Sequence, residues 1–390
     1  MSTMESSVVV SSKAVDRLRA GHLWIYRSDV LTCEAGPGEV VVVRDKAGHF
    51  HGKAFYSSSS LISLRLLTGS EIVIDRNFWK ARLRSADQLR RLVVKDADAY
   101  RLVHSEADGL PSIVVDRYSD VLTLQTLSQG SERMKSVLVE LLIELFQPRA
   151  IVERNDSKVR KLEGLPLDRS VLWGEEPGEI VCTENGVRFY VQPLTGQKTG
   201  AFLDQRENRE WARRLARGKA LDCFCYTGAF ALYLAQSCEE VEAVDISDAA
   251  IQAGQRNAQL NGLDQVRFEV ENAFDRLRLY DHLKKRFDTI VLDPPAFAKN
   301  RSQLEAAYRG YREINLRALK LLNAGGLLIT ASCSQLVDES TFLNLLTQAA
   351  ADARKRVQVV QKRSQAQDHP FLLSMPETHY LKCLFLRVLD

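Results

Sequence analysis

The sequence predicts an α/β protein that contains an open sheet with its ligand at the carboxyl ends of the strands. Three apolar runs end in an acidic residue: the first at Asp222, the second (VEAVDIS) at Asp245 and the third (DTIVLDPP) at Asp293. Segments of helix length separate the three runs, so strand and helix alternate along this part of the chain. In open α/β sheets the ligand lies where the strands end. We therefore expect the three acids to lie beside a bound ligand.

The composition is that of a globular protein with more than one domain. The chain has 390 residues, of which 45% are hydrophobic and 26% charged, and this predicts two or three domains. No apolar run reaches membrane-spanning length, and the first ten residues lack the basic start and apolar core of a signal peptide. We therefore expect a cytoplasmic protein with no membrane partner. Such a multidomain chain is also compatible with a homodimer.

The cysteines and the charge exclude further classes. Seven cysteines, an odd number without a CxxC pair, predict reduced thiols and neither a disulfide framework nor a metal site. A net charge of +3 excludes a uniformly basic nucleic-acid-binding protein. Arginine and lysine are nevertheless dense in residues 76–95. A helix there would present cations to phosphates, although a solvated helix face is the simpler interpretation.

Three regions differ in their patterning. Residues 1–72 contain short β segments separated by turns, which predict a compact β-barrel-like domain. Residues 73–185 predict a mixed α+β domain with a long basic helix and a hairpin that turns near Ser119 and Asp120. Residues 186–390 hold the strand and helix alternation. The last apolar segment of that region, HYLKCLFLRV, is expected to pair with GGLLITASCS.

The turn after Asp222 is the candidate cofactor loop. Gly228 near a strand end lets the backbone approach a ligand closely. The turn is not GxGxxG, which disfavours a dinucleotide, whereas S-adenosylmethionine (SAM) has no phosphate and needs no such grip. Asp245, 23 residues after Asp222, can accept hydrogen bonds from both ribose hydroxyls. It could instead cap a helix, but Ser247 or Asp248 fills that role better.

Asn272 and Ala273 follow the strand pattern VRFEVE. An amide at this place can bond the exocyclic amine of adenine. Taken alone, Asn272 is also a common turn residue. The order of glycine turn, ribose acid and Asp-Pro-Pro favours a SAM-dependent methyltransferase.

Asp293, Pro294 and Pro295 form the strongest single motif. Two prolines at a strand end remove backbone donors and stiffen the loop. Carbonyl groups and one carboxylate can then face a flat substrate, and Phe297 can stack on a base. The alternative is a rigid loop that carries no chemistry.

Cys333 is the candidate nucleophile. It follows the apolar run GGLLIT, at a strand end where the substrate of such a sheet is expected. A buried structural cysteine is the default interpretation, but a thiolate is a good nucleophile when nearby donors or cations favour it. Cys223 and Cys225 are the rival thiols. They flank Phe224 in the cofactor turn, where packing or lining the pocket is expected of them.

Taken together, these motifs resemble, along nearly the whole chain, the class I methyltransferases that make 5-methylcytosine in large-subunit ribosomal RNA. GHLWIYRSDV resembles the signature of a PUA domain, and SEADGLPSIVVDRY resembles the central domain of the family. LTGQKTGAFLDQRENR, LDCFCYTGAFAL, LDPPAFAK and SCS resemble motifs of the catalytic domain. Cys225 stands where serine is common and Asn272 where aspartate is common. The Pro-rich loop carries Ala296 and Phe297, and no cysteine.

The resemblance implies an N-terminal PUA-like β-barrel that binds RNA, a central α+β domain and a C-terminal Rossmann-like class I methyltransferase domain. It implies SAM as cofactor and ribosomal RNA of the large subunit as partner. The implied cofactor residues are Lys198, Thr199, Gly200, Phe202, Asp204, Arg206, Asp222, Phe224, Tyr226, Thr227, Gly228, Asp245, Ile246, Ser247, Asn272, Ala273 and Asp293. On physical grounds alone, Asp204 and Arg206 could equally hold each other on the surface.

The resemblance also implies a mechanism. The thiolate of Cys333 adds to C6 of cytosine, C5 takes the methyl group, and loss of the C5 proton frees the cysteine. Asp293 is expected to bond N3 or the exocyclic amine of the base, and Pro294, Pro295 and Phe297 are expected to contact the substrate. The base that removes the C5 proton is not identified.

Three alternatives remain at this point. The first is a SAM enzyme of other regiochemistry, at guanine N7 or adenine N6, which would need no thiol. The second is a non-catalytic RNA-binding ribosome-assembly factor with a vestigial fold, which Asp222, Asp245, Asp293 and Cys333 together argue against. The third, a NAD-dependent dehydrogenase, is disfavoured by the missing GxGxxG.

Overall fold

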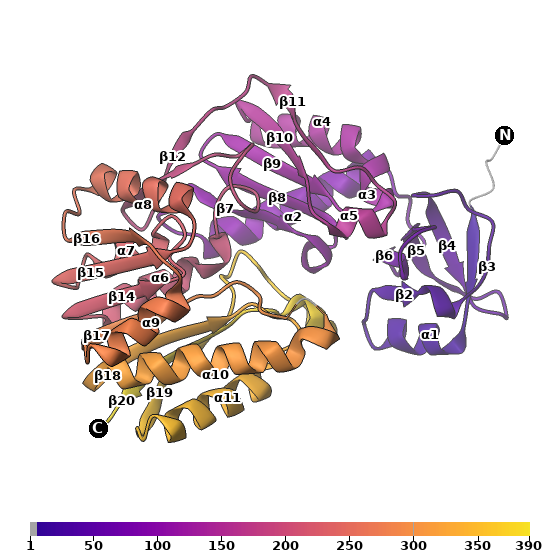
Figure 1. The fold of residues 1–390 in the computed structure, drawn as a ribbon. Coiled ribbons are helices and arrows are strands. Elements are labelled where there is room, and N and C mark those ends of the chain that lie inside the picture. The colour runs from indigo at the N-terminus through magenta and orange to yellow at the C-terminus, as the bar shows by residue number, and fades with distance from the viewer. Residues whose placement is uncertain (1–5, 299) are drawn as a thin grey trace. The chain divides into compact units, whose positions relative to one another are not determined.

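The structure is a computed structural model that describes residues 6–298 and 300–390 (Figure 1). The first five positions of the predicted 1–72 domain and the last position of the LDPPAFAK motif lie outside the described residues. The chain forms two compact units. The first consists of Met1–Cys182, Val191–Leu203 and Gln367–Thr378, and the second of Thr183–Tyr190, Asp204–Ala366 and His379–Asp390. Within the described part, no helix is long and apolar enough to span a membrane.

The first unit begins with a six-stranded sheet in the order β2-β6-β5-β4-β1-β3. Its strands are β1 (Ser7–Val10), β2 (Trp24–Tyr26), β3 (Val30–Cys33), β4 (Val40–Arg44), β5 (Phe50–Tyr56) and β6 (Ile62–Thr68). β1 and β4 are parallel, and the other neighbours are antiparallel. Helix α1 (Ser12–Arg19) begins where Ser11 Oγ accepts a hydrogen bond from the Ala14 amide. Alternating valines of β1 and β4 supply the core of this sheet.

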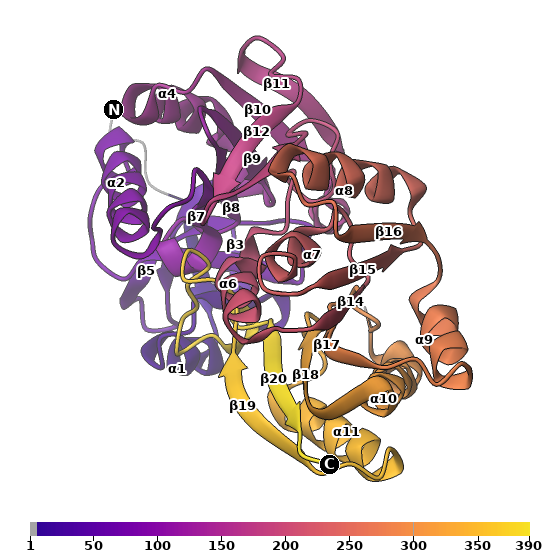
Figure 2. The same cartoon turned by 90° about the vertical axis from the view of Figure 1, so that its left-hand side faces the viewer.

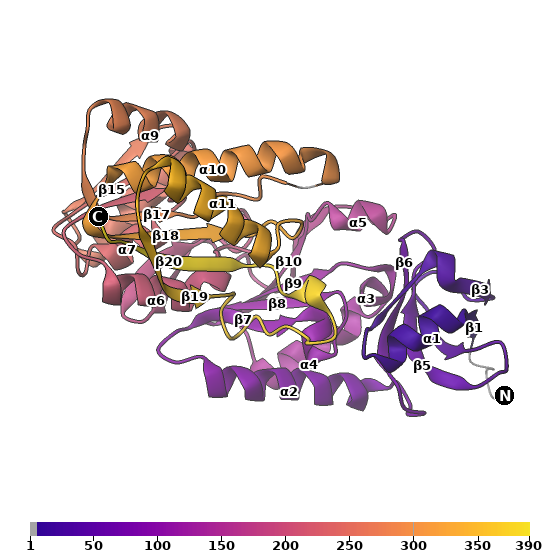
Figure 3. The same cartoon turned by 90° about the horizontal axis from the view of Figure 1, so that it is seen from below.

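A five-stranded sheet follows in the order β11-β10-β9-β8-β7. Its strands are β7 (Ala99–His104), β8 (Ile113–Tyr118), β9 (Val121–Thr126), β10 (Ala150–Asn155) and β11 (Asp168–Gly174). The helices of this region are α2 (Arg76–Val93), α3 (Gln129–Arg133), α4 (Lys135–Phe146) and α5 (Val159–Leu162). α2 and α4 lie beside the sheet (Figure 3), and their apolar side chains share a buried core with it. The predicted hairpin is confirmed, since Tyr118 and Val121 pair across a turn at Ser119 and Asp120.

The basic segment that the sequence singles out forms α2, and acids of the same unit neutralise several of its charges. Arg76 contacts Glu144 at 2.9 Å, and Lys80 pairs with the same carboxylate. Arg90 is buried and holds Asp108 through two hydrogen bonds of 2.5 and 2.7 Å. These pairs favour the interpretation of α2 as a structural helix with a solvated face over one that presents its cations to phosphates.

The second unit is built on a seven-stranded sheet in the order β16-β15-β14-β17-β18-β20-β19 (Figures 1 and 2). Its strands are β14 (Lys219–Cys223), β15 (Glu240–Asp245), β16 (Val266–Val270), β17 (Phe287–Leu292), β18 (Leu322–Ser332), β19 (Val357–Arg363) and β20 (Lys382–Val388). β14 to β18 are parallel, whereas β20 is antiparallel to both β18 and β19. The predictions of an open α/β sheet and of pairing between the last segment and GGLLITASCS are confirmed.

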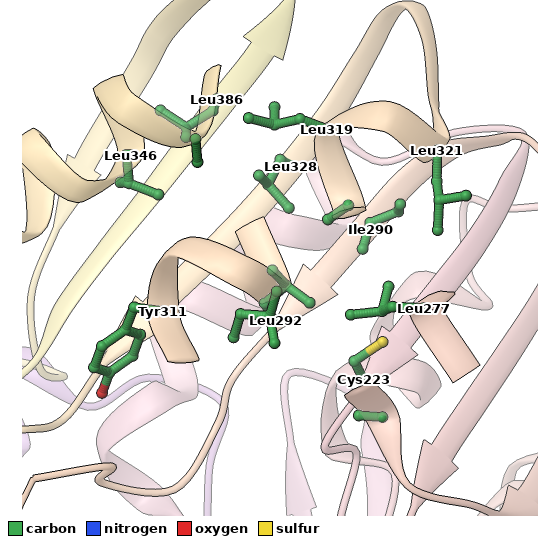
Figure 4. Packing of buried hydrophobic residues seen from close by; sticks show 14 of the residues in the cluster. Cys223, Leu277, Ile290, Leu292, Tyr311, Leu319, Leu321, Leu328, Leu346 and Leu386 are labelled. Carbon is green, nitrogen blue, oxygen red and sulfur yellow. The ribbon is translucent and has the colours of Figure 1, made fainter. Parts of the chain in front are cut away.

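Helices cover both faces of this sheet. They are α6 (Arg206–Leu215), α7 (Ala229–Leu234), α8 (Asp248–Asn261), α9 (Ala273–His282), α10 (Leu304–Leu321) and α11 (Glu339–Asp352). On one face α9, α10 and α11 bury apolar side chains against β14, β17, β18 and β20, as Figure 4 shows around Leu292 and Leu328. On the other face α6, α7 and α8 form a second core. With both faces covered, the central strands β17 and β18 are mainly apolar and buried, and polar function is left to their ends.

A hairpin of β12 (Ile180–Glu184) and β13 (Val187–Val191) precedes this sheet. Within the second unit, Glu184 is buried and accepts two hydrogen bonds of 2.9 and 2.8 Å from the Arg209 guanidinium. The Tyr233 hydroxyl donates to the same carboxylate at 2.9 Å. This satisfied polar cluster ties the hairpin to α6 and α7.

Candidate active site

The parallel strands of the second unit end at one edge of the sheet. Cys223 at the end of β14 pairs with both Val244 of β15 and Leu292 of β17, and Leu292 pairs in turn with Thr330 of β18. β14 lies between β15 and β17, so the chain changes direction across the sheet beside it. This change of strand order is where open α/β sheets bind their ligands. The acids at the ends of β14, β15 and β17 and Cys333 after β18 therefore lie at one edge.

Asp222 is fully buried in β14 and carries an oxygen that lacks a protein partner. Its Oδ2 accepts a hydrogen bond of 2.9 Å from the Ala231 amide of α7. Among the described residues nothing bonds its buried Oδ1. Burial raises the pKa of Asp222 well above its ordinary value, and the negative charges of Asp293 and Asp245 raise it further. An unsatisfied buried carboxylate oxygen suits a cation or a hydrogen-bond donor on a ligand.

The turn between β14 and α7 has an unusual backbone. Phe224 (φ 64°) and Tyr226 (φ 50°) are left-handed although they are not glycine, and Gly228 follows with φ 79°. Each such non-glycine residue costs about 1–2 kcal/mol, so the fold maintains this turn against local strain. A Cβ at Gly228 would lie 2.7 Å from the Phe268 ring. Gly228 thus packs closely against a side chain of β16, and its approach to a ligand stays a prediction.

Asp245 connects two loops at the end of β15. Its Oδ2 accepts from the Tyr226 amide and its Oδ1 from the Ser247 amide, both at 2.9 Å. Ser247 Oγ caps α8 by accepting from the Ala250 amide, which confirms that serine fills the cap role. Asp245 is half-buried, and each of its oxygens keeps a second lone pair for a ribose hydroxyl. Ile246 beside it is 72% exposed, so it can still cover a ligand.

Asn272 and Ala273, the predicted cofactor residues at the start of α9, have structural roles. Asn272 caps α9, since its Oδ1 accepts a hydrogen bond of 2.9 Å from the Phe274 amide. This matches the alternative role in a turn, and the contact with adenine stays a prediction. Ala273 is buried in the first turn of α9. The Thr227 carbonyl accepts a hydrogen bond of 3.0 Å from Asn257, which ties the glycine turn to α8.

Asp293 is half-buried at the end of β17, and a glutamine positions it. Its Oδ1 accepts a hydrogen bond of 3.0 Å from Gln205 Nε2. Gln205 is itself fixed, because its Oε1 accepts from Asn208 at 2.6 Å. Pro294 is buried, whereas Pro295 is exposed. The loop therefore offers one oriented carboxylate and one exposed proline to a substrate.

Phe297 packs within a cluster of aromatic rings. Its ring centroid lies 4.7 Å from that of Tyr311, 5.9 Å from Phe274 and 6.4 Å from Phe224. A Cβ at Gly310 of α10 would come within 3.2 Å of the ring. Phe297 is half-buried here and anchors the Pro-rich loop to α10. Its stacking on a base stays a prediction.

Cys333 immediately follows β18 and is half-buried. Its thiol donates a hydrogen bond to the Pro294 carbonyl, with 3.9 Å between sulfur and oxygen. The Tyr311 hydroxyl lies 3.0 Å from both Ser332 Oγ and Ser334 Oγ, and all three of these side chains are buried. One tyrosine of α10 thus fixes the residues on either side of Cys333. The sulfur is held beside the Asp-Pro-Pro loop.

The rival thiols are less suited to react. Cys223 and Cys225 are buried, and burial raises the pKa of both well above the ordinary thiol value, with the negative charge of Asp222 adding to the effect. Of the seven cysteines, Cys33 and Cys333 are half-buried and the others are buried. Cys333 is therefore the one accessible thiol of the second unit. A thiolate is the nucleophilic form, and burial in apolar surroundings disfavours it.

Four predicted cofactor residues belong to the first unit. The ammonium of Lys198 lies 4.1 Å from the Phe202 ring centroid. Thr199 is buried and its hydroxyl donates to Asp116 of β8. Gly200 has φ 142°, a conformation that favours glycine. The segment is thus fixed to the central domain, and its contact with a cofactor stays a prediction.

The alternative in which Asp204 and Arg206 form a pair on the surface is wrong. Both are buried, at 5% and 2% exposure. Asp204 Oδ2 accepts a hydrogen bond of 2.8 Å from the Tyr380 hydroxyl, and Arg206 contacts Glu207 at 2.7 Å. Burial of both charges shows that they are part of the framework of the second unit.

Three residues that contact the site are not among the predicted site residues. They are Gln205, which orients Asp293, Tyr380, which bonds Asp204, and Lys382, whose Nζ donates to the Ser334 carbonyl at 2.7 Å. Gln205 lies within the motif LTGQKTGAFLDQRENR, but the motif assigned it no role. One signal was available: a single lysine interrupts the apolar run HYLKCLFL. Among the residues with described positions, no group of three His, Cys, Asp or Glu side chains is arranged to hold a metal.

Comparisons with known proteins agree with this architecture. A family model described as S-adenosylmethionine-dependent methyltransferase matches residues 151–382, and a PUA-like domain model matches residues 8–69. Proteins of Shewanella denitrificans and Erwinia tasmaniensis, both named ribosomal RNA large subunit methyltransferase I, are 42% identical to the chain. These alignments cover 95% and 94% of this chain and 96% of each relative.

A solved SAM-dependent methyltransferase from Streptococcus mutans has the same fold, with a TM-score of 0.84 and 20% identity over 98% of this chain and 100% of that one. A methyltransferase solved in complex with SAH superposes with a TM-score of 0.85, also at 20% identity, over 98% of this chain and 100% of that one. The predicted fold class, a PUA-like domain followed by a methyltransferase domain, is confirmed.

The chemistry of the sheet edge fits SAM, which carries a sulfonium and an ammonium cation beside its ribose. Asp222, Asp245 and Asp293 form a cluster of negative charge, and Asp222 holds a buried oxygen without a protein partner. When bound, SAM supplies an electrophilic methyl group. The chain belongs to the S-adenosylmethionine-dependent methyltransferases, in the family that includes the proteins named ribosomal RNA large subunit methyltransferase I.

Proposed function

We propose that this protein methylates C5 of a cytosine in large-subunit ribosomal RNA, through a covalent bond between Cys333 and C6 of the base. The single observation that carries the proposal is the position of Cys333. It is a half-buried thiol at the end of β18, and its sulfur contacts the carbonyl of Pro294 in the Asp-Pro-Pro loop. The RNA class is inferred from the printed names of relatives that are 42% identical.

The choice of C5 follows from what a thiol is needed for. A ring nitrogen or an exocyclic amine has a lone pair and can attack a methyl donor directly. C5 of cytosine lacks one and becomes nucleophilic only after a nucleophile adds to C6. A cysteine fixed at the substrate end of the sheet has no evident purpose in nitrogen methylation. Cys333 therefore supports carbon methylation over the guanine N7 and adenine N6 alternatives.

The steps balance without an oxidant or a metal. The Cys333 thiolate forms a bond to C6, and the electron pair of the C5–C6 double bond shifts toward N3 and the carbonyl group. C5 then forms its new bond to the methyl carbon as the bond between that carbon and the sulfonium sulfur breaks, and the neutral thioether is the leaving group. Loss of the C5 proton to a base restores the double bond and expels the Cys333 thiolate. We expect Asp293, which accepts a hydrogen bond of 3.0 Å from Gln205, to bond N3 or the exocyclic amine while charge develops there.

The RNA must present this base out of its stack, at a cost of a few kcal/mol. The PUA-like domain, matched over residues 8–69, is the module that we expect to bind RNA and offset this cost. We retain the domain limits 1–72, 73–185 and 186–390 as part of the proposal. A homodimer stays a prediction.

The test is nucleoside mass spectrometry on large-subunit RNA that lacks its native methylation. Wild type with SAM should produce 5-methylcytidine. Cys333→Ala should reduce the product roughly a thousandfold or more, because removal of a nucleophile blocks the path. Cys238→Ala is the matched control, since Cys238 is buried in the second core, and it should keep wild-type activity.

A second arm traps the covalent bond. RNA carrying 5-fluorocytosine at the target should accumulate a protein–RNA adduct, because fluorine cannot leave C5 as a proton does. Peptide mapping should place the adduct on Cys333. Methylated guanine or adenine, or equal product from wild type and Cys333→Ala, would refute the proposal. Absence of any product with intact SAM binding would refute the choice of RNA.

A further inference from the structure

Lys382 occupies an unusual place beside the candidate nucleophile. It is the first residue of β20 and pairs with Ser332, the last residue of β18. Because β20 runs antiparallel to β18, its first residue lies at the edge where the parallel strands end. Lys382 is only 5% exposed. Lys382 is thus a buried lysine whose partner in the strand ladder, Ser332, is the residue immediately before Cys333.

The ammonium is bonded only to neutral groups. Nζ donates to the Ser334 carbonyl at 2.7 Å and to the Tyr380 carbonyl at 2.8 Å. Within the described part of the chain, no carboxylate lies within salt-bridge distance of it. A buried cation without a carboxylate partner is costly, so lysine at this position needs a reason.

The acids nearest to Lys382 are committed elsewhere. Asp338 Oδ1 caps α11 by accepting from the Thr341 amide at 2.7 Å. Glu339 forms an ion pair with Lys362 of β19. Burial lowers the pKa of Lys382 to about 8, while Cys333, Asp338 and Glu339 act in the opposite direction, with Cys333 the strongest of the three. Cys333 is therefore the anionic partner that best matches this ammonium.

We propose that Lys382 is the positioning residue of Cys333: it holds the Ser332–Ser334 segment through the Ser334 carbonyl and stabilises the Cys333 thiolate by its positive charge. The inference rests on the proposed function, in which Cys333 is the nucleophile. Ionisation releases the thiol proton to water, and Lys382 keeps its own proton. No bond of Lys382 forms or breaks.

The other groups with described contacts to the Cys333 segment are neutral or acidic. The Tyr311 hydroxyl, from α10, is neutral, since burial raises its pKa. From the Pro-rich loop, the Pro294 carbonyl accepts from the thiol and Asp293 is acidic. Lys382, from β20, is the cation that faces the segment among the residues whose contacts the structure gives. Its charge is present below pH about 8 and is lost above.

The test measures thiol reactivity without RNA, so its outcome is independent of the methylation assay. Iodoacetamide alkylates the thiolate, with a new carbon–sulfur bond and loss of iodide, and peptide mass spectrometry reads the rate at Cys333 between pH 5.5 and 10. Lys382→Met should slow alkylation at neutral pH about tenfold or more, because a tenfold loss of thiolate corresponds to one pKa unit. The deficit should shrink above pH about 8, where wild-type Lys382 also loses its charge.

Two matched variants separate charge from structure. Lys382→Arg keeps the charge at every pH used and should alkylate within about threefold of wild type, since arginine does not deprotonate in proteins. Lys284→Met removes an exposed lysine that follows α9 and has no ion pair among the described contacts, and it should leave the rate unchanged. In methylation, Lys382→Met should lower kcat while the dissociation constant of SAM stays constant.

An alkylation profile of Lys382→Met that coincides with wild type would overturn the proposal, even if methylation is lost. If Lys382→Met fails to fold, the comparison of wild type with Lys382→Arg decides. The two should agree below pH 8, and a slow Lys382→Arg rate there would refute the role of charge. If Cys333→Ala keeps methylation while Lys382→Met slows alkylation, the proposed function fails but the effect of Lys382 on the thiol stands.

Discussion

The Tyr311 hydroxyl gives the sharpest quantitative prediction. It lies 3.0 Å from Ser332 Oγ and 3.0 Å from Ser334 Oγ, and all three residues are fully buried. Tyr311→Phe removes the oxygen that both serines share and leaves the ring, which packs at 4.7 Å from Phe297, in place. The change therefore removes two buried side-chain hydrogen bonds, together with the bond that the Phe297 backbone makes to the hydroxyl.

The expected cost follows from counting those bonds. Each intramolecular hydrogen bond contributes about 0.5–1.5 kcal/mol, and a buried hydroxyl that stays unsatisfied costs about 1–3 kcal/mol. Loss of both bonds should lower the free energy of unfolding by about 2 kcal/mol. For a domain of this size the melting temperature should fall by roughly 4–8 °C. The looser Cys333 segment should also react more slowly, so kcat should fall while SAM affinity is kept.

Differential scanning calorimetry provides the assay. The transition that saturating SAM raises identifies the catalytic domain, since only a state that binds the ligand is stabilised by it. Tyr308→Phe is the matched control: Tyr308 is on the same helix, is half-buried, and has no hydroxyl bond among the described contacts. Its melting temperature should match wild type. A Tyr311→Phe transition within 1 °C of wild type would show that the serines find other partners and would refute the reasoning.

Two further predictions concern buried charges. Asp222→Asn should weaken SAM binding about tenfold or more in calorimetry, because a bond to a charged group is lost. It should also raise the melting temperature of the cofactor-free protein at pH 8. Because the pKa of Asp222 is raised, its contribution to folded-state stability is present at low pH and is lost as the buried carboxyl ionises, so the gain from Asp222→Asn should shrink toward pH 5. A melting temperature below that of wild type at pH 8 would contradict this. Arg209→Met leaves Glu184 buried without its guanidinium and should cost roughly 3–5 kcal/mol in urea unfolding. Adding Glu184→Gln should restore part of that loss; no recovery would mean that packing, not charge, is responsible.

Much of the fold could be predicted because it depends on local patterns. The acid-terminated strands at Asp222, Asp245 and Asp293, the turn at Ser119 and the pairing of the last segment all follow from apolar runs and turn residues. The division into two compact units could not be predicted, because it depends on contacts between residues that are distant in sequence. Residues 367–378 return to the first unit, where Asp368 accepts a hydrogen bond of 2.8 Å from the Arg101 amide. Local periodicity carries no information about such a return.

The site divides in the same way. Strand-end residues such as Asp245 and Cys333 are visible because their position along the chain fixes their place at the sheet edge. Partners that reach the site from elsewhere are not. Gln205 lies 88 residues from Asp293, and Tyr380 lies 176 residues from Asp204. Their contacts require the tertiary fold, and a glutamine or tyrosine is too common to indicate a role by itself.

The distribution of charge along the sheet edge connects the candidate cofactor site with the proposed nucleophile. The ends of β15, β14 and β17 carry acids, and the burial of Asp222 beside Asp293 and Asp245 is unfavourable until a cation binds. β18 then carries the thiol, and the first residue of antiparallel β20 carries the buried lysine. The acids at the ends of β14, β15 and β17 favour a cationic methyl donor, and the buried lysine of β20 favours an anionic thiolate at Cys333. Under the proposed function, the same edge would stabilise both charged reactants, because antiparallel β20 brings a cation to the end of β18, while β14, β15 and β17 end in acids.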